Sequence, residues 1–374
     1  MAKLKNICTF YAGTGFPVKY QGQVAGQYAF YKVGDISDSV RSGKIYLDGS
    51  NNYISNQDVK EIKGTIIPKD TVVFAKIGEA VRLNRRAITS ENCLVDNNVM
   101  GIAPDQHRLS LRYFFYFMKM LKMEVLAEST TVPSVRKTKL EDIDIYLPNM
   151  DKQNEISDLL DNVDFIIRLK RQQIEELDDL VKSRFVEMFG TYPANEKRWE
   201  TGIIRDLVTD VRYGSSRKAS DGKEGQYPYL RMNNITYSGE LDLTEIKTID
   251  IPEDELPKCS VQRGDVLFNR TNSKELVGKT CVYNRDEMMV LAGFVIRIRV
   301  NDRVLPEFLS SYLNMDFSKA MLLSMCKAAI GQANINAQEL QNIGIYIPSI
   351  SEQKLFVAFK NKIDKSKFNK MRVA

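Results

Sequence analysis

The stretch DKQNEISDLLDNVDFIIRLKRQQIEELDDLVKSRFVEMF, residues 151–189, decides the fold. It contains no proline or glycine, and its apolar residues recur in alternating steps of four and three, which is typical of a long helix with a coiled-coil seam. At ~1.5 Å per residue this helix is roughly 55–60 Å long, so it needs an apolar partner. Asp151 is the predicted N-cap, and Gly190 is expected to end the helix. The expected seam consists of Ile156, Leu160, Val163, Ile167, Ile174, Leu177 and Val181.

The chain supplies a partner by repeating itself about two hundred residues later. LEDIDIYLP at 140–148 matches LQNIGIYIP at 340–348, and Gln153 then falls on Gln353. Earlier segments align as well: GQYAFYK at 26–32 matches GQYPYLR at 225–231, and this alignment pairs Gly15 with Gly214. The repeat predicts a tandem duplication of one unit followed by one helix. On the second helix Ser351 is the expected N-cap, and the expected seam consists of Phe356, Phe359 and Ile363.

The duplication predicts the fold class and the domain organisation. Short apolar runs such as Thr71–Ala75 and Val266–Phe268 match between the copies and are expected to be buried strands. We predict an α+β protein with two similar strand-rich domains, separated by two long helices that form an antiparallel coiled coil. The second helix corresponds only to positions up to 174, which leaves open how the distal end of the first helix packs. The predicted segments are residues 1–150, first domain; 151–189, long spacer helix; 190–198, linker; 199–350, second domain; and 351–374, second, shorter spacer helix.

Composition bounds the class of protein. With 53 Lys and Arg against 48 Asp and Glu, the net charge of +5 is a weak overall bias toward anions, so the local distribution of charge matters more. The five cysteines form no Cys-x-x-Cys pair, and neither a signal peptide nor an uninterrupted apolar 18-mer is present. These features predict a reduced cytoplasmic protein without a membrane span. The single histidine, His107, lies in a polar turn and is expected to be a surface residue.

Motifs for catalysis are incomplete. Residues 278–280, GKT, are similar to the end of a phosphate-binding loop, but Ser273 stands where that loop requires glycine. Residues 61–63 and 245–247 read Glu-x-Lys, as in metal-dependent nucleases, although alternating charge on a half-exposed strand gives the same pattern. The sequence lacks the Asn/Asp-Pro-Pro-aromatic motif of amino-methyltransferases. We therefore predict no catalytic or metal-binding residue, with a Glu-x-Lys nuclease as the alternative.

Polar, basic loops recur at equivalent places in both copies, and this recurrence predicts a surface that contacts double-stranded DNA. Lysine and arginine neutralise phosphates, and arginine and asparagine also read base edges. A scaffold that binds only proteins through its coiled coil is a third reading. In the first unit the expected DNA contacts are Thr14, Gly15, Lys19, Lys32, Lys76, Arg82, Arg85 and Arg86. In the second unit they are Arg212, Gly214, Ser215, Ser216, Arg217, Lys218, Arg231, Asn233, Arg270, Thr271, Asn272, Ser273 and Lys274.

Over nearly its full length the chain resembles the specificity subunits of type I restriction-modification systems. The resemblance is carried by the duplication, the closing segment at 143–148, the following Gln153 and Gln353, the opening from Trp199 to Val208, and GQANIN at 331–336. It implies that each domain recognises one half of a bipartite DNA target and that the helices dock two modification subunits. Those subunits would hold S-adenosylmethionine and methylate adenine, and restriction subunits would join them for cleavage.

The resemblance also places every cofactor outside this chain. S-adenosylmethionine, Mg and ATP are expected on partner subunits, and the chain itself is expected to be non-catalytic. A stiff spacer would fix the distance between the two reading domains. One duplex turn is about 34–36 Å, so the length of the spacer translates into base pairs between the half-sites.

Overall fold

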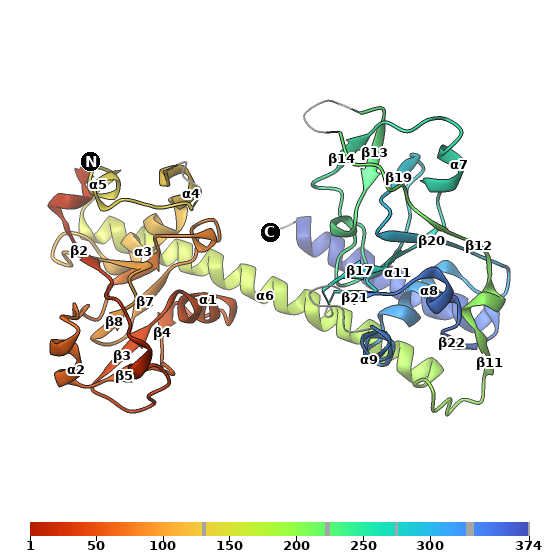
Figure 1. Ribbon diagram of the computed structural model, residues 1–374, viewed down its shortest axis with the longest axis horizontal. Coiled ribbons are helices and arrows are strands. Elements are labelled where there is room, and N and C mark those ends of the chain that lie inside the picture. Colours follow the sequence, from red (N-terminus) through yellow and green to blue (C-terminus); the bar gives the residue numbers. More distant parts are fainter. Residues whose placement is uncertain (129–131, 221–224, 274–275, 327–332, 373–374) are drawn as a thin grey trace. The chain divides into compact units, whose positions relative to one another are not determined.

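The computed structural model describes residues 1–128, 132–220, 225–273, 276–326 and 333–372 (Figure 1). The chain divides into two compact units, Met1–Ile166 and Ile167–Ala374, which are described separately below. None of the helices in the described ranges has both the length and the apolarity to cross a membrane.

Unit 1 is built on two sheets with helices around them. The larger sheet has five strands in the order β2-β9-β6-β7-β4, and the smaller has three in the order β5-β3-β8. A two-stranded ladder of β1 and β10 joins the start of the unit to its closing segment. The strands are β1 (Ala2–Lys3), β2 (Cys8–Ala12), β3 (Tyr28–Tyr31), β4 (Tyr46–Leu47), β5 (Tyr53–Ile54), β6 (Val72–Ala75), β7 (Ala87–Thr89), β8 (Cys93–Val95), β9 (Val99–Pro104) and β10 (Asp144–Ile145). The helices are α1 (Val33–Arg41), α2 (Asn56–Glu61), α3 (Leu111–Met120), α4 (Met123–Leu126) and α5 (Lys137–Glu141).

Unit 2 repeats this plan. Its main sheet runs β12-β20-β16-β18, its second sheet β14-β13-β19-β15, and β11 pairs with β22 as β1 pairs with β10. The single parallel pair of each second sheet, β3–β8 and β13–β19, also corresponds. The strands are β11 (Glu200–Ile203), β12 (Val208–Tyr213), β13 (Tyr227–Leu230), β14 (Lys247–Ile249), β15 (Ser260–Val261), β16 (Val266–Asn269), β17 (Thr271–Asn272), β18 (Thr280–Val282), β19 (Met289–Leu291), β20 (Val295–Val300), β21 (Ala333–Asn334) and β22 (Gly344–Ile347). The helices are α7 (Leu256–Cys259), α8 (Pro306–Asn314), α9 (Asp316–Met325) and α10 (Ala337–Gln341). The prediction of two similar α+β domains is confirmed.

The two long helices are α6 (Met150–Phe189) and α11 (Ile350–Arg372). Asn149 Oδ1 accepts from the Lys152 backbone N–H at 3.0 Å, and Ser349 stands in the same place before α11. The predicted N-caps, Asp151 and Ser351, are therefore wrong by two residues, because each helix begins directly after the Pro-Asn or Pro-Ser pair. At the other end of α6, Gly190 adopts a φ of 80°, a left-handed conformation that favours glycine and ends the helix as predicted.

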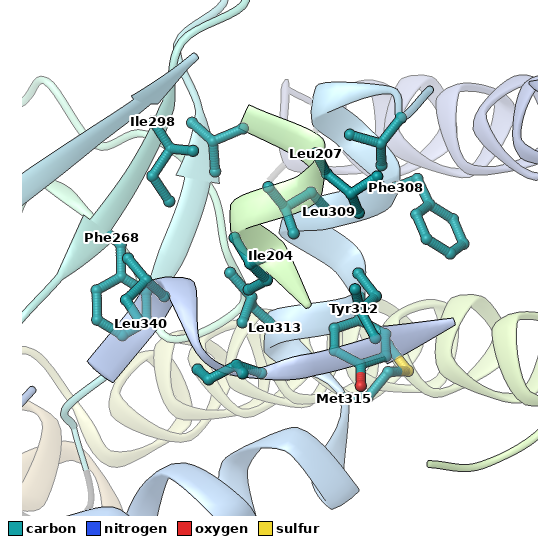
Figure 2. Packing of buried hydrophobic residues seen from close by; sticks show 14 of the residues in the cluster. Ile204, Leu207, Phe268, Ile298, Phe308, Leu309, Tyr312, Leu313, Met315 and Leu340 are labelled. Atoms are coloured by element: carbon teal, nitrogen blue, oxygen red, sulfur yellow. The ribbon is translucent and has the colours of Figure 1, made fainter. Parts of the chain in front are cut away.

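The C-terminal half of α6 packs into the core of unit 2. Phe185 and Phe189 have no exposed surface, and their rings lie 5.1 and 5.7 Å from the ring of Phe356 on α11. Phe308 of α8 completes this aromatic cluster. Figure 2 labels Phe308 together with Leu309, Tyr312 and Leu313 of the same helix. The sequence did not show how the C-terminal end of α6 packs. In the structure this end is buried in the core of unit 2.

Contacts between α6 and α11 show that the helices run antiparallel. Phe356 contacts the end of α6, whereas Lys367, further along α11, forms an ion pair with Asp178, earlier on α6. Between them the guanidinium of Arg184 lies 5.8 Å from the ring of Phe359. Ile363 is partly buried against the same core, and the predicted seam residue Val181, which is 8% exposed, belongs to the core itself.

The N-terminal half of α6 is held in unit 1 mainly by polar contacts with α3. Arg112 pairs with Asp158 at 2.8 Å, Lys119 pairs with Asp164 at 2.7 Å, and Tyr116 donates a hydrogen bond to Asp161. For Ile156, Leu160, Val163, Ile167, Ile174 and Leu177, pairing with the second helix stays a prediction. This half also exposes large apolar side chains, with exposed fractions of 42 to 64% at Leu159, Val163, Phe165, Ile166 and Leu169.

One glutamine closes each unit in the same way. Gln353 is fully buried; its Oε1 accepts from the Leu305 N–H at 2.8 Å, and its Nε2 donates to the carbonyls of Arg303 at 3.1 Å and Pro348 at 2.8 Å. Gln153 repeats the pattern with Ser110, Arg108 and Pro148 at 2.7, 2.9 and 2.9 Å. This joint ties the start of the long helix to the closing strand and to the loop before α3 or α8.

The predicted linker after α6 packs against unit 2. Tyr346 of β22 donates to the Gly190 carbonyl at 2.9 Å, and Trp199 Nε1 donates to the Phe189 carbonyl at 3.1 Å. The ring of Tyr192 lies 6.3 Å from that of Tyr312. Residues 190–198 are therefore held at both ends and in the middle.

Candidate nucleic-acid interface

The first polar loop of each unit follows β2 or β12. Thr14 N donates to the carbonyl of Val95 at 2.8 Å, and Ser215 N donates to that of Leu291 at 2.6 Å. The preceding residues, Gly13 and Gly214, pass so close to the next strand that a Cβ would lie 1.8 and 2.3 Å from a carbonyl oxygen. Gly214 thus corresponds to Gly13. The sequence alignment, which paired Gly214 with Gly15, is therefore wrong by two residues. The hydrogen bonds of Thr14 and Ser215 fix this register, which the similarity between the two segments does not determine.

Two cations of unit 1, Lys19 of this loop and Lys32 after β3, lie beside the rings of Tyr20 and Phe16. Lys19 is exposed and forms an ion pair with Glu61, which also accepts from Tyr20 Oη at 2.8 Å and raises the pKa of Lys19. Lys32 donates to Gln21 Oε1 at 3.1 Å, and its Nζ lies 5.1 Å from the ring of Phe16. Loop residues predicted to contact DNA are thus brought together, although Lys19 is partly neutralised.

The basic segment 82–86 contributes less surface than predicted. Arg86 is only 3% exposed, and its guanidinium donates to Asn84 Oδ1 and to the carbonyls of Arg85 and Leu121 at 2.8 to 3.1 Å. Burial lowers the pKa of Arg86 to about 10. Arg86 is a structural residue and its predicted DNA contact is wrong. Arg82 remains exposed beside Glu79 and Glu124, and Arg85 is half-buried.

In unit 2 the loop after β12 is held by ion pairs. Arg217 binds Glu255 through two nitrogens at 3.1 and 2.5 Å, which raises the pKa of Arg217 and lowers that of Glu255. Arg212 pairs with Asp210 at 2.8 Å. Ser215 is buried, and its Oγ accepts from the Arg217 backbone N–H at 3.2 Å. Ser216 and Lys218 are exposed and stay candidates for phosphate contacts.

Lys32 and Arg231 are cations at equivalent positions in the two units. Each follows the last residue of β3 or β13, and the backbone N–H of each donates to the side chain three residues on, Asp35 at 2.6 Å or Asn234 at 2.9 Å. Both are half-buried, and Arg231 reaches the Glu245 carbonyl at 3.4 Å. Asn233, between Arg231 and its partner, is exposed.

A further group of donors in unit 2 lies where β16 ends, and its members Arg270, Thr271 and Asn272 are half-buried. The guanidinium of Arg270 lies over the ring of Tyr213, 4.7 Å from its centre. Thr271 Oγ1 donates to Asn334 Oδ1 at 3.1 Å, and Asn272 Oδ1 accepts from the Ser273 N–H at 2.9 Å. Among the described residues, neither asparagine amide nitrogen has a hydrogen-bond acceptor. Lys274, predicted with them, lies outside the described residues, as do Gly331 and Gln332.

Tyr213 and Asn334 were missing from the predicted set. Tyr213 followed Arg212 in the basic loop, and an aromatic residue beside arginines is a frequent platform for stacking. Asn334 belongs to the segment GQANIN, which the sequence marked only as a family feature. Their meeting with Arg270 depends on pairing between segments more than fifty residues apart.

The incomplete catalytic motifs have structural roles. Lys279 is buried and donates to the carbonyls of Met232 at 3.0 Å and Ile235 at 2.5 Å, so it is not free to bind phosphate. Residues 61–63 do not form a strand: α2 ends at Glu61, and Lys63 adopts a φ of 50°. Within the described part of the chain, no three His, Cys, Asp or Glu side chains are grouped to hold a metal ion.

A cavity of about 710 Å³ opens within unit 2 between α6, α8, α9 and α11. Its lining mixes charges, and the cations Lys182, Lys360 and Lys367 are each paired with a carboxylate. Lys319 instead donates to the Gly278 carbonyl at 2.5 Å, and burial together with the charges of Lys279 and Lys182 lowers its pKa to about 7. We therefore assign the cavity no ligand.

Comparison with known proteins agrees with this duplicated architecture. The family model described as type I restriction modification DNA specificity domain matches residues 1–179 and again residues 196–372. The chain belongs to this family. Two relatives of the family are the EcoKI specificity subunit of Escherichia coli K12, 21% identical over 62% of this chain and 53% of the relative, and the EcoBI specificity subunit of Escherichia coli, 21% identical over 77% and 65%. The chain spans about half the length of the curated relatives it matches.

The solved structure of another protein has the same fold as this chain. It comes from a study of complex assembly and conformational transition of the type I restriction-modification system, and it matches with a TM-score of 0.53 at 16% identity. The match covers 100% of this chain and 91% of the other. Both the pair of mixed domains and the long helices are thus features of a known fold.

Proposed function

We propose that this chain is the DNA-recognition subunit of a type I restriction-modification complex. Each unit would read one half of a bipartite double-stranded target, and the chain would carry out no catalysis itself. One observation carries the proposal: two units of the same plan present cations at structurally equivalent positions, Lys32 with Arg231 and Lys76 with Arg270. A protein that reads two separate short sequences needs two such surfaces.

The proposal assigns the remaining activities to partners. Modification subunits would bind the long helices, because the exposed apolar residues of α6 between Leu159 and Leu169 form a surface that favours a protein partner. Those subunits would bring S-adenosylmethionine and methylate adenine. Restriction subunits would join in the full complex, with Mg and ATP. Membership of the family supports these partners and a location in the cytoplasm.

The nuclease alternative has no support. Residues 61–63 end a helix, and Glu61 is engaged by Lys19 and Tyr20. In the second copy only Lys247 belongs to a strand, at the edge of its sheet, and Glu245 precedes it. Neither segment therefore presents its Glu and Lys on one strand, which the nuclease reading needs.

Methylome sequencing tests the proposed function. The host is sequenced with and without the gene for this chain, while its modification partner is kept. We expect one split adenine-methylated motif to disappear with the chain and to return on complementation. A parallel band-shift with the chain and its modification partner should show preference for that motif over random duplex. Equal affinity for all sequences, with an unchanged methylome, would rule the proposal out.

A further inference from the structure

Lys76 and Arg270 occupy the same place in the two units. Each is the first residue after a central strand of the main sheet, β6 or β16. The backbone N–H of Lys76 donates to the Asn98 carbonyl at 2.8 Å, and that of Arg270 donates to the Phe294 carbonyl at 3.0 Å. Both residues are half-buried. The backbone therefore places a cation at the equivalent position of each unit.

The segment that precedes the closing helix completes this frame. It donates a backbone hydrogen bond of 2.9 Å to the carbonyl of each cation, from Val135 to Lys76 and from Ile335 to Arg270. Beside these bonds, Ile77 bridges to Ser134 as Thr271 pairs with Asn334. The two cations are thus fixed between the main sheet and a second segment that also carries polar side chains.

Arg270 is held without a counter-ion. Its guanidinium stacks on Tyr213, whose Oη accepts from the Ala337 N–H at 2.8 Å, so the ring itself is fixed. Its Nε is buried without a hydrogen-bond partner, and in the part of the chain that the structure describes no carboxylate pairs with it. A planar guanidinium that is pre-oriented on an aromatic ring loses little freedom when its outer nitrogens bind a ligand.

Other arginines of unit 2 are bound differently. Arg212, Arg217 and Arg263 each form an ion pair with a carboxylate of unit 2, at 2.5 to 2.8 Å. Part of each guanidinium is therefore already engaged: Nε in Arg212, and Nε with one terminal nitrogen in Arg217 and Arg263. Arg270 has no carboxylate partner among the described residues, and the amide nitrogens of Asn272 and Asn334 lie in the segments on either side of it.

We propose that Arg270 reads a guanine in the half-site of unit 2 and that Lys76 makes the equivalent base contact in the half-site of unit 1. The fork of an arginine matches O6 and N7 of guanine in the major groove, whereas lysine approaches the same atoms as a single charge. Tyr213 is then a positioning residue that holds the fork in plane, and Arg217 shapes its loop. This inference rests on the proposed function.

The test measures base preference position by position. The full chain with its modification partner selects from a duplex library with both half-sites randomised, and the bound fraction is sequenced. For Arg270→Ala we expect a roughly 10- to 100-fold loss of preference for guanine at one position of one half-site, with every other position unchanged. Arg270→Lys should retain part of that preference, and Tyr213→Leu should weaken it at the same position. Lys76→Arg should alter only the other half-site.

The control is Arg263→Ala, which removes an exposed, ion-paired cation of the same unit and should leave every preference in place. Trp199 fluorescence verifies that each unit 2 variant is folded. If Arg270→Ala weakens binding equally for all sequences, the residue contacts phosphate and the inference is overturned. If wild-type protein selects no bipartite sequence, the proposed function itself fails, which is a different result.

Discussion

Gln353→Ala removes the side chain that joins α11 to the body of unit 2. The fully buried amide makes three hydrogen bonds, to the Leu305 N–H and to the carbonyls of Arg303 and Pro348. Alanine leaves all three backbone groups without this partner in a site that the side chain had filled. The effect should therefore be larger than that of an ordinary surface substitution.

The structure sets the magnitude. A buried polar group left unsatisfied costs about 1–3 kcal/mol, and partial access of water at the exposed residue Arg303 should relieve one of the three losses. We expect the free energy of unfolding of unit 2 to fall by about 3 kcal/mol. Gln353→Glu should be at least as damaging, because a buried carboxylate would face two carbonyl oxygens in place of the amide that donates to them.

Urea denaturation followed by fluorescence measures this change. The only tryptophan, Trp199, lies in unit 2 and is bonded to the Phe189 carbonyl, so its signal reports this unit. With a slope of about 2–3 kcal/mol per molar urea, the midpoint should fall by about 1–1.5 M. Gln338→Ala, an exposed position on α10, is the matched control and should not move the midpoint.

Gln153→Ala provides the internal comparison. It removes the same three hydrogen bonds in unit 1. The free energy of unfolding of unit 1, followed by circular dichroism, should therefore fall by a similar amount. A shift below 0.5 kcal/mol for Gln353→Ala, or a neutral Gln353→Glu, would refute the reasoning that the amide is a structural joint.

Three further predictions follow from the same structure. The pKa of Lys319 is about 7 in the folded protein, and its ordinary value is 10.5. Between these pH values folding releases a proton from Lys319, so its contribution to the free energy of unfolding rises with pH. Lys319→Met should stabilise the protein at pH 7 and flatten that rise, as urea denaturation at pH 7 and pH 9 will show; an unchanged slope would contradict the pKa. Arg86→Ala should destabilise unit 1 by about 2 kcal/mol, measured by circular dichroism, without altering any base preference, because its hydrogen bonds are internal. Inserting seven residues after Gln172 lengthens α6 by about 10 Å, or roughly 3 base pairs, and methylome sequencing should find the same half-sites further apart; altered half-site bases would argue against a spacer role.

The sequence predicted the architecture because the duplication was preserved at the positions that close each unit. The segment around Tyr146 and Tyr346 and the glutamines that follow it could be aligned directly, and they mark the same joint in the structure. The apolar rhythm of residues 151–189 located α6 almost to its ends. Local pattern was sufficient wherever a residue's role is set by its immediate neighbours in the chain.

Prediction failed where distant segments decide the role. The sequence predicted that Arg86 is a surface cation. Its guanidinium is instead buried and donates hydrogen bonds to Asn84 Oδ1 and to the carbonyl of Leu121, thirty-five residues away. The stacking of Arg270 on Tyr213 requires β12 and β16 to lie in one sheet, separated by β20, and no spacing in the sequence encodes that. The same reason explains the two-residue error at Gly15, since only the sheet register identifies the close approach at Gly13.

The repeated glutamine joint fastens each unit to the start of its long helix in the same way. Every bond that Gln153 forms at the exit of unit 1 has a counterpart at the exit of unit 2, with main-chain groups as the partners in each case. Because main-chain atoms are common to all residues, a foreign unit spliced in beside Pro148 or Pro348 would find the same fastening. Under the proposed function, exchanging one unit in this way would change one half of the DNA target and leave the glutamine joint intact.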